Sequence, residues 1–138
     1  MPSIAQVAIG KLDALQIFGD DYETRDGTGE RDYIHVTDLA KAHIAALSEI
    51  DEAAAFEVYN IGTGQGTTVK ELLAAYGNIV GRVLPSHVTA RRLGDVASSV
   101  ASPNKANEVL NWSAKFSIHD AISTSWNWQS QNPNGYAS

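Results

Sequence analysis

The sequence predicts a mixed α/β (α+β) fold, with a small mixed sheet and several helices in one domain spanning residues 1–138. Two patterns support this. Short alternations of apolar and polar residues at 15–18 and 56–61 are typical of strands, and apolar residues at helical spacing follow capping residues such as Thr68 and Ser117. A chain of 138 residues can bury roughly 68% of its unfolded surface, which allows a real core.

The N-terminal part is predicted to contain a helix over residues 2–9, with Gly10 placed for its C-cap, and a strand over 15–18. Residues 19–21 form a turn cluster. The polar segment 22–30 is interpreted as a loop whose carboxylates form a solvated face. Its spacing lacks the alternating oxygen ligands and final glutamate of a calcium loop, so calcium binding is excluded.

The chain is expected to change from extended to helical near Tyr33–Asp38, because β-forming residues precede an apolar pattern of helical spacing. The helix is predicted from about Thr37 to Ser48, and a polar, alanine-rich connection over 49–55 leads to the strand at 56–61. Arg31 is predicted to lie at a loop mouth just before this helix. Taken alone, its simplest interpretation is a solvated surface charge.

Residues 62–66 are rich in glycine and precede a helix, which invites comparison with phosphate-binding loops. The spacing fits neither the dinucleotide-binding pattern nor the Walker pattern with its lysine, so a turn without phosphate is favoured. Thr68 and Glu71 form a capping box at the start of a helix that runs to about Val80.

The C-terminal part begins with a β-rich run at 83–89, which Pro85 indicates is an edge strand or a bent one. Residues 91–95 then form a loop with two arginines, a glycine and a carboxylate. A short helix is predicted to begin at Ser102-Pro103, and Ser117 is predicted to cap the last helix, which stops at 132–135.

Composition excludes several classes of function. A formal net charge of -6 repels nucleic acid, and no apolar run is long enough to cross a membrane. The absence of cysteine excludes thiolate sites and, without a signal-peptide pattern, indicates the cytoplasm. The four histidines have no metal-ligand spacing, and no nucleophile–base pair is evident. What the residues do offer is two arginine-bearing segments, around Arg31 and Arg92, suited to a diphosphate or another dianion.

Several ungapped motifs resemble the C-terminal part of enzymes of the UDP-glucose 4-epimerase family, within the extended short-chain dehydrogenases/reductases. They run nearly from end to end and include Ile17-Phe18-Gly19-Asp20-Asp21-Tyr22, Arg31-Asp32-Tyr33-Ile34-His35-Val36, Tyr59-Asn60-Ile61-Gly62-Thr63-Gly64, Arg91-Arg92-Leu93-Gly94-Asp95 and Trp126-Asn127-Trp128-Gln129.

In that family an N-terminal Rossmann domain holds NAD and the catalytic tyrosine and lysine, and neither the glycine fingerprint nor that pair has a counterpart here. The resemblance therefore implies no catalytic residue, no cofactor and no metal bound by this chain, only contacts to a UDP-hexose. It assigns Arg31 and Arg92 to the diphosphate, Asp95 to the ribose, Gln16, Ile17 and Phe18 to the uracil, Tyr33 and Val69 to the surrounding wall, and Ser99 to the position that gates sugar size.

The small side chain of Ser99 leaves room for an N-acetyl group, so the resemblance implies that a complete enzyme would accept UDP-GlcNAc as well as UDP-glucose. The expected function is the substrate-binding half of a UDP-glucose/UDP-galactose 4-epimerase, inactive alone and weak in UDP-hexose binding. The alternative is a free-standing truncated relic that acts as an interaction module or forms a homo-oligomer through the apolar face left by the missing domain.

Overall fold

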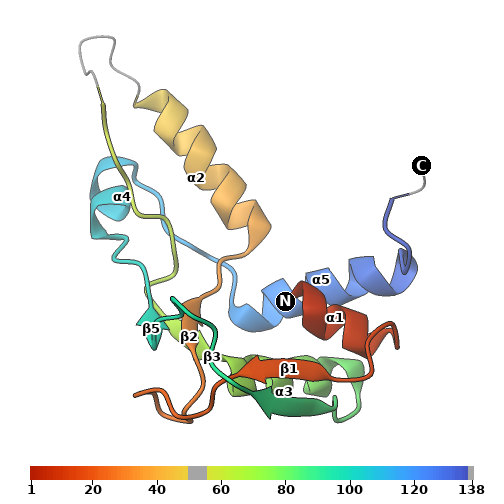
Figure 1. The fold of residues 1–138 in the computed structure, drawn as a ribbon. Coiled ribbons are helices and arrows are strands. Elements are labelled where there is room, and N and C mark those ends of the chain that lie inside the picture. The colour runs from red at the N-terminus through yellow and green to blue at the C-terminus, as the bar shows by residue number, and fades with distance from the viewer. Residues whose placement is uncertain (50–55, 137–138) are drawn as a thin grey trace.

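The computed structural model describes residues 1–49 and 56–136 and has the expected mixed α/β architecture of helices and small sheets (Figure 1). In chain order, the elements are α1 (Pro2–Ala8), β1 (Leu15–Phe18), β2 (Glu30–Asp32), α2 (Val36–Ser48), β3 (Gly66–Thr68), α3 (Val69–Val80), β4 (Ser86–Thr89), β5 (Ser98–Ser99), α4 (Asn104–Val109) and α5 (Ile118–Gln131).

Two small sheets place the ends of distant segments together. β1 pairs in parallel with β4, with Phe18 opposite Thr89, so the segment that follows β4 starts beside Phe18. The second sheet has the order β3-β2-β5, in which β2 is antiparallel to β3 and parallel to β5. β2 is therefore the central strand: all three of its residues pair with β3, and Glu30 and Arg31 also pair with β5.

The main core lies where α1, α3 and α5 pack together against β1 (Figure 1). Leu72 and Tyr76 lie four residues apart on one face of α3 and are almost fully buried, as is Ile122 of α5. The Tyr76 ring meets Trp126 edge to face, with 6.3 Å between ring centroids. A second cluster, built around Ala42, Ala106, Leu110 and Trp112, joins α2 to the α4 region.

The predicted caps of α3 and α5 are confirmed. The Thr68 hydroxyl accepts a hydrogen bond from the Glu71 amide, and the Glu71 carboxylate accepts one from the Thr68 amide, which completes the capping box of α3. Ser117 caps α5 in the same way with Asp120. These caps fix where both helices begin.

Four details differ from the sequence-based expectations. Residues 56–61 form no strand, and the strand of this region is β3, which begins at Gly66, the last residue of the expected glycine-rich turn. β5 was not expected at all. Helix α2 begins at Val36, one residue before the expected start at Thr37, because His35 is its N-cap, and α4 has Pro103 rather than Ser102 at its N-cap. Partner strands distant in sequence decide where β3 and β5 form, whereas the His35 side chain caps α2 locally, at the Thr37 amide.

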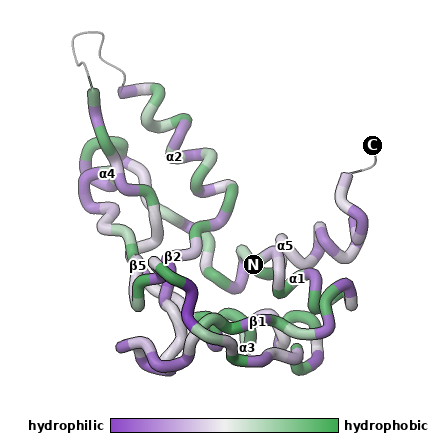
Figure 2. The backbone as a smooth tube through the Cα atoms, in the orientation of Figure 1, coloured by the Kyte–Doolittle hydropathy of each residue, from purple (hydrophilic) through white to green (hydrophobic). Residues whose placement is uncertain are grey.

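One face of α2 remains exposed. Val36, Ile44 and Leu47 recur at helical spacing, and their exposed fractions are 73%, 64% and 67%. In Figure 1, α2 extends away from the core, and Figure 2 shows hydrophobic and hydrophilic positions alternating along it. Residues 50–55 of the expected connection after α2 lie outside the described residues. Within the described ranges, no helix has the length and apolar character that a membrane span requires.

Candidate functional site

A pocket of about 250 Å³ opens between the edge of β1, the middle of β2, the start of α3 and the loop after β4. Pockets that hold drug-sized ligands measure roughly 300–1,000 Å³, so this one would enclose part of a nucleotide sugar. Of the nine residues that the resemblance assigned, those that line it are Gln16, Ile17, Phe18, Arg31, Tyr33, Val69, Arg92 and Asp95.

Arg31 lies within strand β2 and not at a loop mouth as expected. Its guanidinium donates a hydrogen bond of 2.7 Å to the backbone oxygen of Glu30 and makes no ion pair with any carboxylate of the described residues. The charge of Arg31 is therefore available to an anion in the pocket.

Arg92 reaches the same pocket from the loop after β4. Its guanidinium lies over the Phe18 ring, 4.4 Å from the ring centroid, and its Nε pairs with Asp95 at 3.0 Å. The pairing of β1 with β4 explains this contact, because it places the loop next to the end of β1. Arg92 is thus held by an aromatic face and a carboxylate, and it lines the same pocket as Arg31.

The neighbouring arginine has a structural role instead. Arg91 pairs with Asp21 at 2.6 Å, and its guanidinium covers the Tyr22 ring at 4.0 Å. Gly19, with φ of 88°, allows this packing, since a Cβ there would come within 2.6 Å of the Arg91 side chain. Of the two adjacent arginines, only Arg92 lines the pocket.

Tyr33 and Val69 complete the pocket wall. Burial raises the pKa of the Tyr33 hydroxyl above its ordinary value, an effect that the charge of Arg31 partly opposes. The hydroxyl therefore stays protonated at neutral pH and can donate a hydrogen bond. Val69 is the first residue of α3, and its amide donates to the Gly29 backbone oxygen at 3.1 Å.

The structure does not place Ser99 in the pocket wall. Ser99 lies in β5, directly opposite Arg31 of β2, and is exposed. Paired residues of neighbouring strands share a face of the sheet, so Ser99 stands on the same side as Arg31, beside the pocket.

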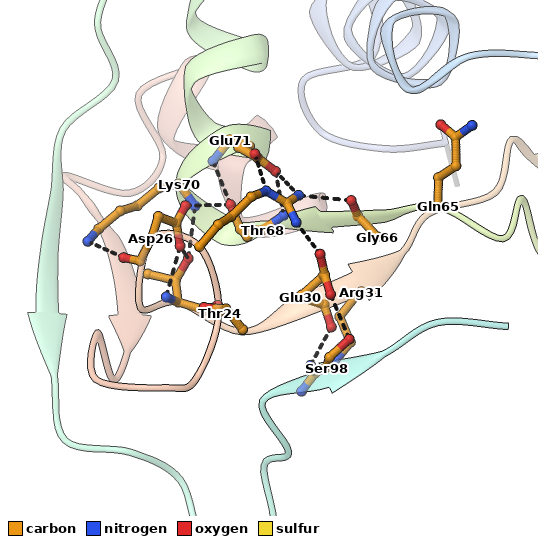
Figure 3. A network of polar contacts seen from close by, with 12 residues as sticks. Thr24, Asp26, Glu30, Arg31, Gln65, Gly66, Thr68, Lys70, Glu71 and Ser98 are labelled. Carbon is orange, nitrogen blue, oxygen red and sulfur yellow. Dashed lines mark hydrogen bonds and ion pairs between the residues drawn. The ribbon is translucent and has the colours of Figure 1, made fainter.

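A polar network covers the opposite face of the same sheet (Figure 3). Arg25 pairs with Glu30 and Glu71 and donates to the Gly66 backbone oxygen at 2.9 Å. Glu30 also accepts a hydrogen bond of 2.6 Å from Ser98.

A second group of contacts attaches the preceding loop to α3. Asp26 accepts hydrogen bonds from Thr28 and from the buried Thr68 hydroxyl, the latter at 2.5 Å. Lys70 donates to the Asp26 backbone oxygen at 3.0 Å. The carboxylates of residues 22–30 were expected to form a solvated face, and for Asp26 and Glu30 this expectation is wrong.

The glycine-rich segment is occupied by a carboxylate of the chain itself. The Asp32 side chain accepts hydrogen bonds from the amides of Thr63 and Gly64, at 3.0 and 2.9 Å, and from the Thr63 hydroxyl at 2.6 Å. A Cβ at Gly62 would come within 2.5 Å of this carboxylate. The amides that a phosphate would need are therefore engaged, which supports the favoured interpretation of a turn without phosphate.

Arg25 and its partners were missed by sequence reasoning because two of its three acceptors, Gly66 and Glu71, lie more than 40 residues away in the sequence. The local Asp26–Thr28 contact has a recognisable signal, since aspartate often bonds the backbone two residues on. In the described part of the chain, no three histidine, aspartate or glutamate side chains are grouped to hold a metal ion.

Comparison with known proteins defines the class of protein. The model of the NAD dependent epimerase/dehydratase family matches residues 2–62. UDP-glucose 4-epimerase of Bacillus subtilis is 47% identical over 138 residues, which is 100% of this chain and 41% of that protein. The chain is thus similar to the NAD dependent epimerase/dehydratase family over residues 2–62 and to a UDP-glucose 4-epimerase over its whole length.

Within that family the similarity is to UDP-glucose 4-epimerases. The crystal structure of the Bifidobacterium longum enzyme in complex with NAD+ and UDP has a TM-score of 0.93 and 48% identity, covering 98% of this chain and 40% of that one. The UDP-Glc/GlcNAc 4-epimerase of Campylobacter jejuni has a TM-score of 0.81 and 35% identity, covering 94% and 40%. The chain spans about 40% of the length of these relatives, an extent consistent with their C-terminal part.

Proposed function

We propose that this chain is the UDP-hexose-binding half of a 4-epimerase, a single domain that contributes substrate contacts but no catalytic residue and no NAD site. One observation carries the proposal: Arg31 and Arg92, far apart in sequence, line one pocket together with Phe18 and Tyr33. Two guanidinium groups suit a diphosphate, and the Phe18 ring suits a base. The B. longum relative in complex with NAD+ and UDP supports the same assignment.

The first experiment measures binding of UDP and of uridine by calorimetry. We expect weak UDP binding, with a Kd on the order of 0.1–1 mM, because the pocket encloses only part of the ligand. Arg31→Gln and Arg92→Gln should weaken binding of UDP but not of uridine. Lys105→Gln is the matched control, since Lys105 pairs with Glu57 away from the pocket. Equal UDP affinity in all four proteins would contradict the proposal.

The second experiment tests activity. The chain alone should not interconvert UDP-glucose and UDP-galactose with added NAD, because hydride transfer requires the cofactor site. Activity gained on adding the N-terminal half of a UDP-glucose 4-epimerase would show a competent half-site. Activity of the isolated chain would contradict the proposal. A cytoplasmic location belongs to the same proposal and can be checked by cell fractionation.

The exposed face of α2 favours an alternative, that the chain self-associates. Val36, Ile44 and Leu47 present an apolar stripe of the kind that marks interfaces. Sedimentation should then detect dimers or larger species that Ile44→Lys and Leu47→Lys dissociate. Val83→Lys, at an exposed position outside α2, is the control and should have no effect. A monomer at all concentrations would exclude this alternative.

A further inference from the structure

We propose that Arg25 is a positioning residue, whose guanidinium clamps one face of the β3-β2-β5 sheet and thereby holds Arg31, on the opposite face, in place for an anionic ligand. The inference rests on the proposed function, because it takes Arg31 to bind the diphosphate. Arg25 itself does not line the pocket. Its effect would therefore pass through Arg31.

The register of the sheet places the network and the pocket on opposite faces. Thr68, Glu30 and Ser98 are paired across the three strands and form one row. In the antiparallel β3 the preceding residue, Thr67, and in β2 and β5 the next residue lie on the other side of the sheet, since successive side chains of a strand alternate. For β2 that residue is Arg31, and for β5 it is Ser99. Polar bonds within the row thus set the position of the pocket-facing row.

Arg25 connects the elements that carry these rows. It pairs with Glu30 of β2 and, through two nitrogens, with Glu71 of α3. It also donates to the backbone oxygen of Gly66 in β3. In Figure 3, dashed lines that end at the labelled Glu71, Gly66 and Glu30 mark these contacts. A planar fork with five N–H donors can satisfy three separate acceptors, which the compact ammonium group of lysine does less well.

Glu30 extends the clamp to the third strand and needs space to do so. Its carboxylate accepts from Ser98 of β5 at 2.6 Å, which together with the Arg25 contact lowers the Glu30 pKa below its ordinary value. Gly66 provides the space, because a Cβ there would overlap the Glu30 side chain. The ionised carboxylate is therefore held between β3 and β5.

The sheet depends on such side-chain contacts because its strands are short. β2 and β3 have three residues each and β5 has two, so the backbone ladder is small. Isolated short pairings are marginal in water. Loss of the Arg25 contacts would leave β2 free to shift relative to α3, and Arg31 would then move away from its position in the pocket lining.

The experiment compares UDP and uridine binding by calorimetry, at a temperature where circular dichroism shows each protein folded. For Arg25→Gln we expect the Kd for UDP to rise about tenfold, equivalent to the loss of one charge-assisted hydrogen bond. The Kd for uridine should be unchanged. For Arg25→Lys, the Kd for UDP should lie between those of the unaltered chain and Arg25→Gln. The control Lys105→Gln should bind UDP like the unaltered chain. Adding Arg25→Gln to Arg31→Gln should cause no further loss.

The outcomes separate this inference from the proposed function. A lower melting temperature with an unchanged Kd for UDP, or equal losses for UDP and uridine, would overturn the positioning role alone. No UDP binding by the unaltered chain, or no effect of Arg31→Gln, would overturn both. Should Arg25→Gln fail to fold, Ser98→Ala decides, since it removes only the hydrogen bond to Glu30. For Ser98→Ala, a rise of about threefold in the Kd for UDP would support the inference, and an unchanged Kd would refute it.

Discussion

Acid sensitivity offers a direct test of the Arg25 clamp, through the substitution Glu71→Gln. The Glu71 carboxylate accepts hydrogen bonds from Arg25 and from the Thr68 amide. These bonds, and the Arg25 bonds most of all, lower the pKa of Glu71 from its ordinary 4.5 to about 2. Such a group stabilises the folded state above pH 4.5, and the stabilisation is lost as the pH falls from 4.5 toward 2. The glutamine side chain can still accept a hydrogen bond from the Thr68 amide, so the substitution removes the charge while keeping the cap.

The magnitude follows from the two pKa values and the exposure of the side chain. For a shielded group the difference would contribute about 3 kcal/mol to the free energy of unfolding. The Glu71 side chain is 43% exposed, and solvent screening reduces this to about 1 kcal/mol. We therefore expect Glu71→Gln to lose about 1 kcal/mol at pH 7 and nothing near pH 2.

Urea denaturation followed by circular dichroism at pH 7, 5, 3.5 and 2.5 measures this difference. Glu108→Gln is the matched control, because Glu108 is an exposed helical glutamate with no ion pair to the described residues. Comparison with the unaltered chain cancels the contributions of the other carboxylates. Equal stability losses in the two variants, or a Glu71→Gln curve parallel to that of the unaltered chain, would refute the reasoning.

Three further predictions concern the core, the glycine-rich loop and the sugar. Ile122→Ala should reduce the free energy of unfolding by about 2–5 kcal/mol in urea, because Ile122 is fully buried, whereas Val83→Ala at a 94% exposed position should change it little; similar losses would contradict the assigned core. Asp32→Asn replaces an acceptor with a donor facing the Thr63 and Gly64 amides and should cost about 2 kcal/mol, with faster hydrogen exchange at those amides; unchanged exchange would argue against the Asp32 contact. Ser99→Tyr should weaken binding of UDP-GlcNAc more than of UDP-glucose in calorimetry, and equal effects would argue against Ser99 as a gate.

Local signals made part of this fold predictable from sequence. The capping box of Thr68 and Glu71 and the cap at Ser117 depend on residues three apart, so the sequence alone identifies them. The strands β3 and β5 could not be predicted in this way. They have three and two residues and exist through pairing with β2, while the alternating segment 56–61 is not paired as a strand over its described length.

The candidate site likewise combines features that the sequence predicts with features that depend on long-range pairing. Guanidinium chemistry identified Arg31 and Arg92 as candidate anion ligands, but only the parallel pairing of β1 with β4 explains why Arg92 lies over Phe18. The Arg25 clamp also joins partners far apart in the sequence, up to 46 residues from Arg25 to Glu71. Residue chemistry is readable from sequence, whereas these long-range pairings are properties of the folded chain.

The ion pairs of the arginines indicate how the two pocket arginines would share an anion. Arg25, Arg91 and Arg92 each have a carboxylate partner, but Arg31 has none among the described residues. An entering diphosphate would gain most from Arg31, whose charge is not neutralised, while at Arg92 it competes with Asp95. Displacing Asp95 from Arg92 would free its carboxylate to accept a hydrogen bond from a hydroxyl group of the same ligand. The ion pair between Arg92 and Asp95 would thus be exchanged for two ligand contacts, and Arg31→Gln should weaken UDP binding more than Arg92→Gln.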